Sequence, residues 1–195
     1  MELRTFLKNQ NIVNEKDLFE YLNKNEFQWG LIIDGEKTGN ITSQTYTKLW
    51  KLKNFQQMVR DRIAICWDYA NFEKQVFNGL GMKSSTYIIV HDNDMENNPS
   101  HAFTVIEEEK NIKLVEYSFI RHAGIYDMDS LNDIIDMQLR WRFEMPNDAH
   151  LKHLDVKVYK VPNELAENMI FTELVSQKEN WEVVLKKDRD EQIQD

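Results

Sequence analysis

The sequence predicts an α+β fold in which an antiparallel β-sheet packs on one amphipathic helix, with further helices at its flanks. Two observations support this arrangement. Residues 66–78 have the apolar spacing of a helix and are followed by Gly79 and Gly81, which end helices readily. Residues 101–106 and 112–119 are two strand-like runs joined by a short acidic turn, as in a β-hairpin. We expect this helix and this hairpin to form the centre of the domain.

Composition limits the class of protein and of partner. The chain has 195 residues, which is enough for one globular body with a small extension. Its hydrophobic content of 42% argues against disorder, and its net charge of −9 disfavours nucleic acid or an anionic membrane as a partner. No apolar run is long enough for a membrane span and the first residues do not resemble a signal peptide, so we expect a cytoplasmic protein.

Before residue 66 the patterns are short. Asn14 is placed to cap a helix that runs to about residue 25. Residues 29–33 resemble a buried strand that enters a turn at Gly35, and residues 43–60 have an irregular helical pattern. We therefore expect residues 1–55 to form an extension of helix and short strand packed on the core.

After residue 78 the predicted elements alternate. Residues 86–90 and 154–159 read as strands, and residues 181–185 as one more short strand. Ser130 is placed to cap a helix to about residue 143, and Asn163 to cap a final helix that reaches residue 174. The expected main domain covers residues 56–185, and residues 186–195 form a polar tail of both charge signs.

The single cysteine stands at the predicted start of a helix. At this position the helix dipole and the unpaired amide groups stabilise a thiolate, which is the form that acts as a nucleophile. The alternative is that Cys66 is a small buried apolar side chain. With one cysteine, the chain has neither an internal disulfide nor a zinc site made of thiolates.

The hairpin brings a histidine and an acid to one face of the sheet. If the turn is centred between Glu108 and Glu109, His101 lies directly opposite Glu116, with Cβ atoms roughly 5 Å apart. If the loop extends to Asn111, Glu116 becomes the diagonal neighbour of His101, roughly 7–8 Å away on the same face. Both registers allow a contact between the imidazole and the carboxylate.

A cysteine, a histidine and an acid in this order indicate thiol-dependent acyl transfer. Cys66 attacks a carbonyl carbon, His101 moves the proton, and Glu116 orients the imidazole ring. The backbone amide of Cys66 is one candidate donor to the oxyanion of the intermediate. The second donor is undetermined from sequence, and its candidates are Trp50, Gln56 and Gln57.

These segments resemble the transglutaminase-like superfamily, whose core is a papain-like cysteine acyl-transfer fold. Residues 65–70 (ICWDYA) resemble its nucleophile segment, residues 79–82 (GLGM) the turn after its catalytic helix, and residues 101–105 (HAFTV) its histidine strand. Residues 115–119 (VEYSF) and 124–126 (GIY) are similar to the strand of the third residue and the segment beyond it in small bacterial members. The resemblance covers residues 56–136, and it departs from the family at Glu116, where aspartate is commoner, and at Ala64, where glycine is.

The resulting hypothesis is a cysteine hydrolase or acyltransferase that acts on an amide, peptide or isopeptide bond of a peptide or protein substrate, with neither cofactor nor metal. The sequence does not decide between hydrolysis and transfer to an amine, and it leaves the oligomeric state open. The rival hypothesis is a non-catalytic binding module that keeps the fold and the three residues as a polar cluster.

Three weaker signals point elsewhere. Residues 92–96 (DNDME) resemble the start of a calcium loop, which would suggest a calcium-regulated adaptor, but the sixth position is Asn97 where a glycine is expected. His150 and His153 have the spacing of a metal pair without an evident third ligand. His122 competes with His101 as the base, but it does not begin a strand opposite an acid.

Overall fold

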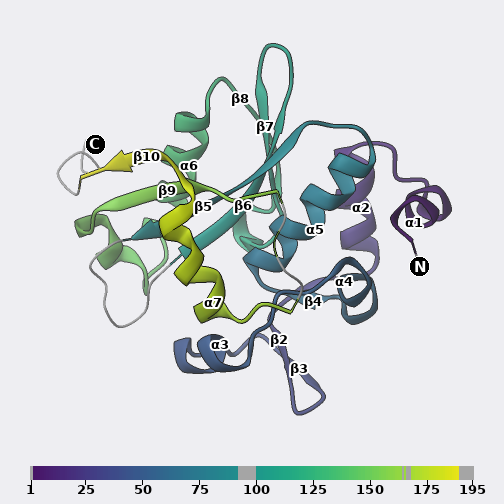
Figure 1. Cartoon of the computed structure of the whole chain (residues 1–195), viewed down its shortest axis with the longest axis horizontal. Helices are drawn as coiled ribbons and strands as arrows, with labels where there is room; N and C mark the ends of the chain where they lie inside the picture. The colour runs from purple at the N-terminus through teal and green to yellow at the C-terminus, as the bar shows by residue number, and fades with distance from the viewer. Residues whose placement is uncertain (1, 92–99, 164, 166–167, 189–195) are drawn as a thin grey trace.

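A six-stranded antiparallel sheet forms the centre of the computed structural model, which describes residues 2–91, 100–163, 165 and 168–188 (Figure 1). The strands lie in the order β10-β9-β5-β6-β7-β8. Their bounds are β5 (Ser84–His91), β6 (Ser100–Glu107), β7 (Ile112–Glu116), β8 (Gly124–Met128), β9 (Val156–Lys160) and β10 (Glu182–Lys187). The antiparallel sheet and its flanking helices agree with the α+β class expected from the sequence.

The β6-β7 hairpin adopts the second of the two expected registers. Thr104 pairs with Val115, and the backbone N–H of Glu108 donates to the carbonyl of Asn111 at 3.0 Å across the loop. Glu116 is therefore the diagonal neighbour of His101 on the same face. The second strand ends at Glu116 and not at residue 119, because the Glu116 carboxylate accepts the backbone N–H of Phe119 and turns the chain into a 3-10 helix, Ile120–His122.

The predicted central helix is present as α5 (Cys66–Gly79) and packs on one face of the sheet. The hydroxyls of Thr86 and Thr104 donate to the carbonyl of Ala70 at 3.4 Å and 3.0 Å, which ties the helix to β5 and β6. The helix predicted after Ser130 is α6 (Leu131–Phe143), and it covers side chains that point to the opposite face, such as Phe103. The sheet is thus covered on both sides.

Two N-terminal helices complete the core beside α5 (Figure 1). The predicted helix α2 (Glu15–Lys24) is capped by Asn14, whose side chain accepts from the backbone of Asp17 at 2.9 Å. Helix α1 (Leu3–Gln10) was not predicted, since the preceding Glu2 makes no capping bond that would mark its start. In the part of the chain that the structure describes, no helix is long and apolar enough to cross a membrane.

The irregular helical pattern over residues 43–60 corresponds to two helices and not to one continuous helix. Two helices, α3 (Ser43–Leu49) and α4 (Phe55–Asp61), are separated by an extended segment whose Trp50 and Lys53 donate to Asp68. The strand expected over residues 29–33 is divided into β1 (Gln28–Trp29) and β2 (Leu31–Ile33) by Gly30, whose φ of +149° only glycine adopts readily. Strand β1 pairs in parallel with β4 (Ile63–Ala64), and β2 forms a hairpin with β3 (Glu36–Thr38).

The last helix begins later than the sequence predicts. Helix α7 (Phe171–Ser176) begins eight residues after the expected cap, Asn163. The backbone N–H of Leu52 donates to the carbonyl of Met169 at 2.9 Å, and the N–H of Asn168 donates to the carbonyl of Leu52 at 3.2 Å. These bonds hold residues 168–170 against the segment before α4. Two 3-10 helices, Ala149–His153 and Gln177–Asn180, precede β9 and β10.

The aromatic packing between α5 and the N-terminal helices predicts a large effect of Phe72→Ala on stability. The Phe72 ring is 1% exposed and stacks on Phe55 at 5.4 Å between ring centroids. We expect its loss to lower the free energy of unfolding by about 3–5 kcal/mol. Urea denaturation measures this, and Val13→Ala, at a side chain that is 70% exposed, serves as the control with a change within about 0.5 kcal/mol.

Candidate active site

The structure brings the three predicted residues Cys66, His101 and Glu116 together from three different elements. Cys66 is the first residue of α5, His101 lies near the start of β6, and Glu116 is the last residue of β7. The Nε2 atom of His101 lies 2.7 Å from Oε2 of Glu116, and the Cys66 side chain is hydrogen bonded to His101. A continuous chain of hydrogen bonds therefore links the thiol to the carboxylate.

The pairing of the hairpin strands ends just before this site. The β6-β7 pairs end at Thr104 and Val115, so the first residues of β6 pair with β5 and have no partner residue on β7. His101 lies in this unpaired part of β6. Its ring packs against Phe103 and Phe119, with centroid distances of 6.4 Å and 5.3 Å, which limits its rotation. The imidazole is thereby held between Glu116 and the start of α5.

The Glu116 carboxylate is buried and accepts four hydrogen bonds. Its Oε2 atom accepts from His101 and from Nε2 of Gln138 at 2.9 Å, while Oε1 accepts from the Ser118 hydroxyl and the Phe119 backbone N–H, both at 2.8 Å. Burial raises the pKa of Glu116, but the charge of His101 and these bonds outweigh burial and lower the pKa below its usual value. Glu116 is therefore ionised at neutral pH.

Sequence reasoning missed Gln138. This residue is 2% exposed and lies on α6 beside the buried Ile134, Ile135 and Leu139. A polar side chain on the apolar face of a helix signals a buried hydrogen-bond partner, because a buried amide without one is costly. That partner is Glu116, which Gln138 holds in place from the opposite side to Ser118.

The same bonds set the charge of the histidine. Burial lowers the pKa of His101, but the Glu116 carboxylate and the hydrogen bonds to Cys66 and Glu116 outweigh burial and raise the pKa to about 9. The ring is thus an imidazolium at neutral pH. A positively charged ring next to a sulfur is the environment typical of reactive cysteines.

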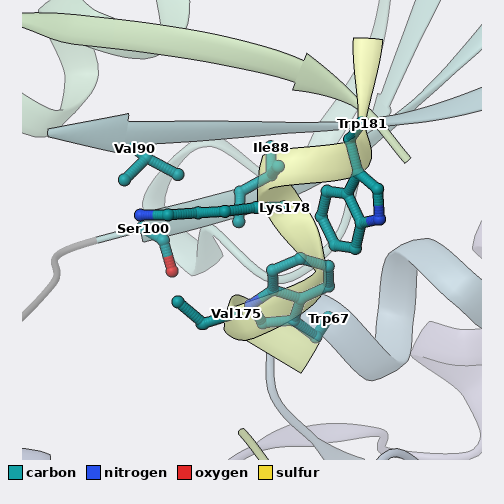
Figure 2. A pocket seen from close by; sticks show the side chains of 7 residues that line it. All are labelled: Trp67, Ile88, Val90, Ser100, Val175, Lys178 and Trp181. Carbon is teal, nitrogen blue, oxygen red and sulfur yellow. The ribbon is translucent and has the colours of Figure 1, made fainter. Parts of the chain in front are cut away.

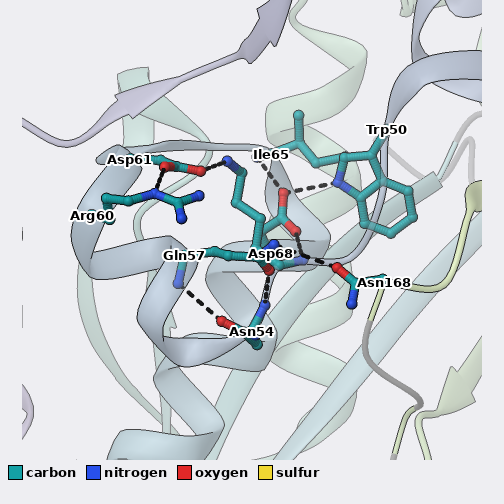
Figure 3. Close-up of polar contacts among 9 residues, drawn as sticks. Trp50, Asn54, Gln57, Arg60, Asp61, Ile65, Asp68 and Asn168 are labelled. Carbon is teal, nitrogen blue, oxygen red and sulfur yellow. Dashed lines mark hydrogen bonds and ion pairs between the residues drawn. The ribbon is translucent and has the colours of Figure 1, made fainter. Parts of the chain in front are cut away.

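A second buried carboxylate, Asp68, fixes the start of α5 (Figure 3). Its oxygens accept the backbone N–H of Lys53 at 2.8 Å, the indole N–H of Trp50 at 2.8 Å and the backbone N–H of Ile65 at 3.2 Å. Ile65 is the N-cap residue of α5, so Asp68 supplies the capping carboxylate. Burial raises the pKa of Asp68 to about 6 against the opposing effect of the three hydrogen bonds.

The side chains predicted as second oxyanion donors have other contacts. The Trp50 indole donates to Asp68, as described above. Gln57 closes the capping box of α4 with Asn54, and its amide nitrogen lies 3.4 Å from Asn168. Gln56 is exposed on α4. A different residue, Tyr46 on α3, has its hydroxyl beside the Ser100 hydroxyl and the Trp67 indole, and it was not singled out from the sequence.

The three histidines among the weaker signals have other surroundings than this cluster. The ring of His122 stacks on Trp141 at 4.5 Å and lies 3.7 Å from Glu144, while the thiol is bonded to His101. His150 and His153 lie in a 3-10 helix, and no group of three metal-ligating side chains occurs among the described residues. The calcium-like residues 92–97 lie outside the described part of the chain.

Comparisons with known proteins give little beyond this geometry. No family model matches the chain, and no curated protein matches it. Among solved structures, the chain is similar to an arylamine N-acetyltransferase from Bacillus cereus that is described as having a Cys-His-Glu catalytic triad. The TM-score is 0.40 and the identity 11%, over 98% of this chain and 73% of that one. A likeness of this size assigns no activity, which leaves the chemistry of the site to its own contacts.

The raised pKa of His101 predicts a loss of stability in alkali. Between pH 6.5 and about 9 the folded protein keeps a proton on His101 that the unfolded chain has released, so the free energy of unfolding falls as the pH rises through this window. The expected contribution is about 3 kcal/mol. Denaturation at several pH values measures it, and the loss should be much smaller in Glu116→Gln. His122→Gln should leave the shape of the curve unchanged.

Asp68 predicts the same direction of change at lower pH. Its pKa of about 6 in the fold lies above the usual value of 3.8, so ionisation of the buried carboxyl costs stability as the pH rises from about 4 to about 6. The cost reaches about 3 kcal/mol. Asp68→Asn should remove this slope from the unfolding free energy measured against pH. An equal slope in wild type and variant would contradict the assignment, and the exposed Asp129→Asn is the control.

Proposed function

We propose that this protein is a thiol-dependent acyl-transfer enzyme with a papain-like, transglutaminase-like fold, and that Cys66, His101 and Glu116 are its catalytic triad. The observation that carries the proposal is the unbroken hydrogen-bond chain from the Cys66 thiol through His101 to Glu116. The proposed substrate is an amide, peptide or isopeptide, and the reaction needs no cofactor. These are the same three residues, in the same roles, that the sequence hypothesis names.

In the first half of the proposed reaction, the Cys66 thiolate forms a bond to the carbonyl carbon and the carbonyl electrons move to oxygen. The resulting oxyanion is stabilised by the backbone N–H of Cys66 at the positive end of α5. When the carbonyl re-forms, the bond to the leaving nitrogen breaks. The departing amine takes its proton from the His101 imidazolium, which leaves a thioester on Cys66 and a neutral imidazole.

In the second half, the neutral imidazole of His101 takes a proton from the acceptor as the acceptor attacks the thioester carbon. The carbon–sulfur bond breaks and returns the thiolate of Cys66, with His101 again an imidazolium. Water as acceptor gives hydrolysis, and an amine gives transfer. Glu116 keeps the ring oriented and stabilises its positive charge throughout, held itself by Gln138 and Ser118.

The accessibility of the thiol supports catalysis over a purely structural cluster. Cys66 is partly exposed, whereas its neighbours Ile65 and Trp67 are 2% and 1% exposed. A structural polar cluster has no need of a thiol at the surface, and a buried ion pair such as His101 with Glu116 contributes little net stability. An accessible thiol and a buried pair of histidine and carboxylate are both expected of a nucleophile and its base.

Alkylation of the single cysteine tests the proposal. We expect iodoacetamide to modify wild-type Cys66 rapidly at pH 6, because the neighbouring imidazolium favours the thiolate. In His101→Ala the rate at pH 6 should fall by about 100-fold towards that of an ordinary thiol. Mass spectrometry of the intact protein over a pH series measures the rates, with Glu116→Ala giving an intermediate loss.

The outcome that overturns the proposal is an ordinary, slow pH profile that neither substitution changes. His122→Ala is the matched control, since it removes a second histidine near the site without touching the thiol. A melting temperature close to that of wild type shows that each variant is folded. Under the rival hypothesis of a binding module, the thiol would react slowly in all of these proteins.

A further inference from the structure

A narrow apolar recess is lined in part by Trp67, the residue after Cys66 (Figure 2). It is bounded by the start of α5, by β5 and by the segment from α7 to β10, and it encloses about 260 Å³ when its open mouth is included. We call it the Trp67 recess, and its lining residues are Trp67, Ile88, Val90, Ser100, Val175, Lys178 and Trp181. Five of these seven side chains are aliphatic or aromatic.

The recess adjoins residues that neighbour Cys66 and His101 in the sequence. Trp67 directly follows Cys66, and Ser100 directly precedes His101. The Cys66 side chain packs against the same hydrophobic cluster that contains Trp67, Ile88 and Trp181. A group bound in the recess therefore lies close to the start of α5, where the sulfur is.

Tyr46 provides a polar group where the recess meets the thiol. Its ring is held by Phe171 at 4.4 Å and by Trp50 at 5.9 Å between centroids, and it packs against the same cluster as Cys66. Its hydroxyl lies beside Ser100 and Trp67, the two residues adjacent in sequence to His101 and Cys66. Burial and the neighbouring Cys66 and Asp68 raise the pKa of Tyr46 well above its usual value, so the phenol keeps its proton.

We propose that the Trp67 recess binds the acyl group of the substrate, a short, uncharged, apolar chain, and that the Tyr46 hydroxyl donates a hydrogen bond to the carbonyl oxygen. This proposal rests on the proposed function and names its substrate class. It also supplies the second oxyanion donor, beside the backbone N–H of Cys66. The hydroxyl donates to the oxyanion without transferring its proton, so the balance of the reaction is unchanged.

The lining sets the chemistry of the acyl chain. Apolar walls favour hydrocarbon, and the narrowness of the recess limits the chain to a few carbons. The side chain of Lys178 extends across the recess towards Val90 and Ser100 (Figure 2). Its positive charge disfavours an acyl group that carries an ammonium.

p-Nitrophenyl acetate and p-nitrophenyl butyrate test the recess, since both acylate a reactive thiol and release a coloured product. Two additional methylenes buried in the recess should make kcat/KM for butyrate about tenfold higher than for acetate. Val175→Trp fills the recess, and it should lower the butyrate-to-acetate ratio to about one or below. Val183→Trp, on the exposed part of β10, should leave the ratio unchanged.

Tyr46→Phe tests the hydrogen bond. It removes only the hydroxyl, and it should lower kcat for both esters by about 10- to 100-fold with KM and the butyrate-to-acetate ratio almost unchanged. Alkylation by iodoacetamide forms no oxyanion, so its rate should stay within about twofold of wild type. Tyr21→Phe, in the N-terminal core, is the matched control and should match wild type in all three measurements.

The outcomes separate this inference from the proposed function. If neither ester acylates wild-type Cys66, the proposed function fails. If both esters acylate Cys66 but the wild-type ratio is near one, or Val175→Trp leaves it unchanged, the acyl site is not the recess. If Tyr46→Phe slows alkylation as much as acylation, or slows neither, Tyr46 is not an oxyanion donor.

Discussion

The candidate site depends on a buried carboxylate that takes no part in the proposed chemistry. Asp68 accepts hydrogen bonds from Trp50, Lys53 and Ile65, and thereby joins the segment between α3 and α4 to the start of α5. Without these donors, the buried carboxylate would lose the hydrogen bonds that offset its removal from water, and the fold would be less stable. The hydrogen bonds of Trp50 and Lys53 to this carboxylate fix the end of α3, and with it the position of Tyr46.

Local patterns in the sequence were sufficient to predict the helix and the hairpin that carry Cys66, His101 and Glu116. Helix α5 could be predicted because its apolar spacing and its terminal glycine are local, and the hairpin because strand alternation restricts the register to few choices. The structure selected the register in which Glu116 is diagonal to His101. That choice depends on the loop bond between Glu108 and Asn111, for which the sequence has no distinct signal.

Contacts between distant segments account for the errors. The sequence pattern over residues 163–174 is helical, but Asn168 and Met169 instead pair with Leu52, more than a hundred residues earlier in the chain. The same holds for the oxyanion candidates, because only the fold shows that the Trp50 indole is used by Asp68 and that the Tyr46 hydroxyl lies by Ser100. Gln138 was missed for another reason, because its place among the apolar positions of the predicted helix is a local signal that the sequence contains.

The pairing of Leu52 with the C-terminal segment has a consequence for synthesis in the cell. Helix α5 and the β6-β7 hairpin leave the ribosome well before α7 and Trp181, which close one side of the Trp67 recess. Contacts of such large sequence separation form late and slow folding. The nascent chain therefore carries Cys66 beside an incomplete recess until its last elements are made, and only the finished protein has all the walls of the recess.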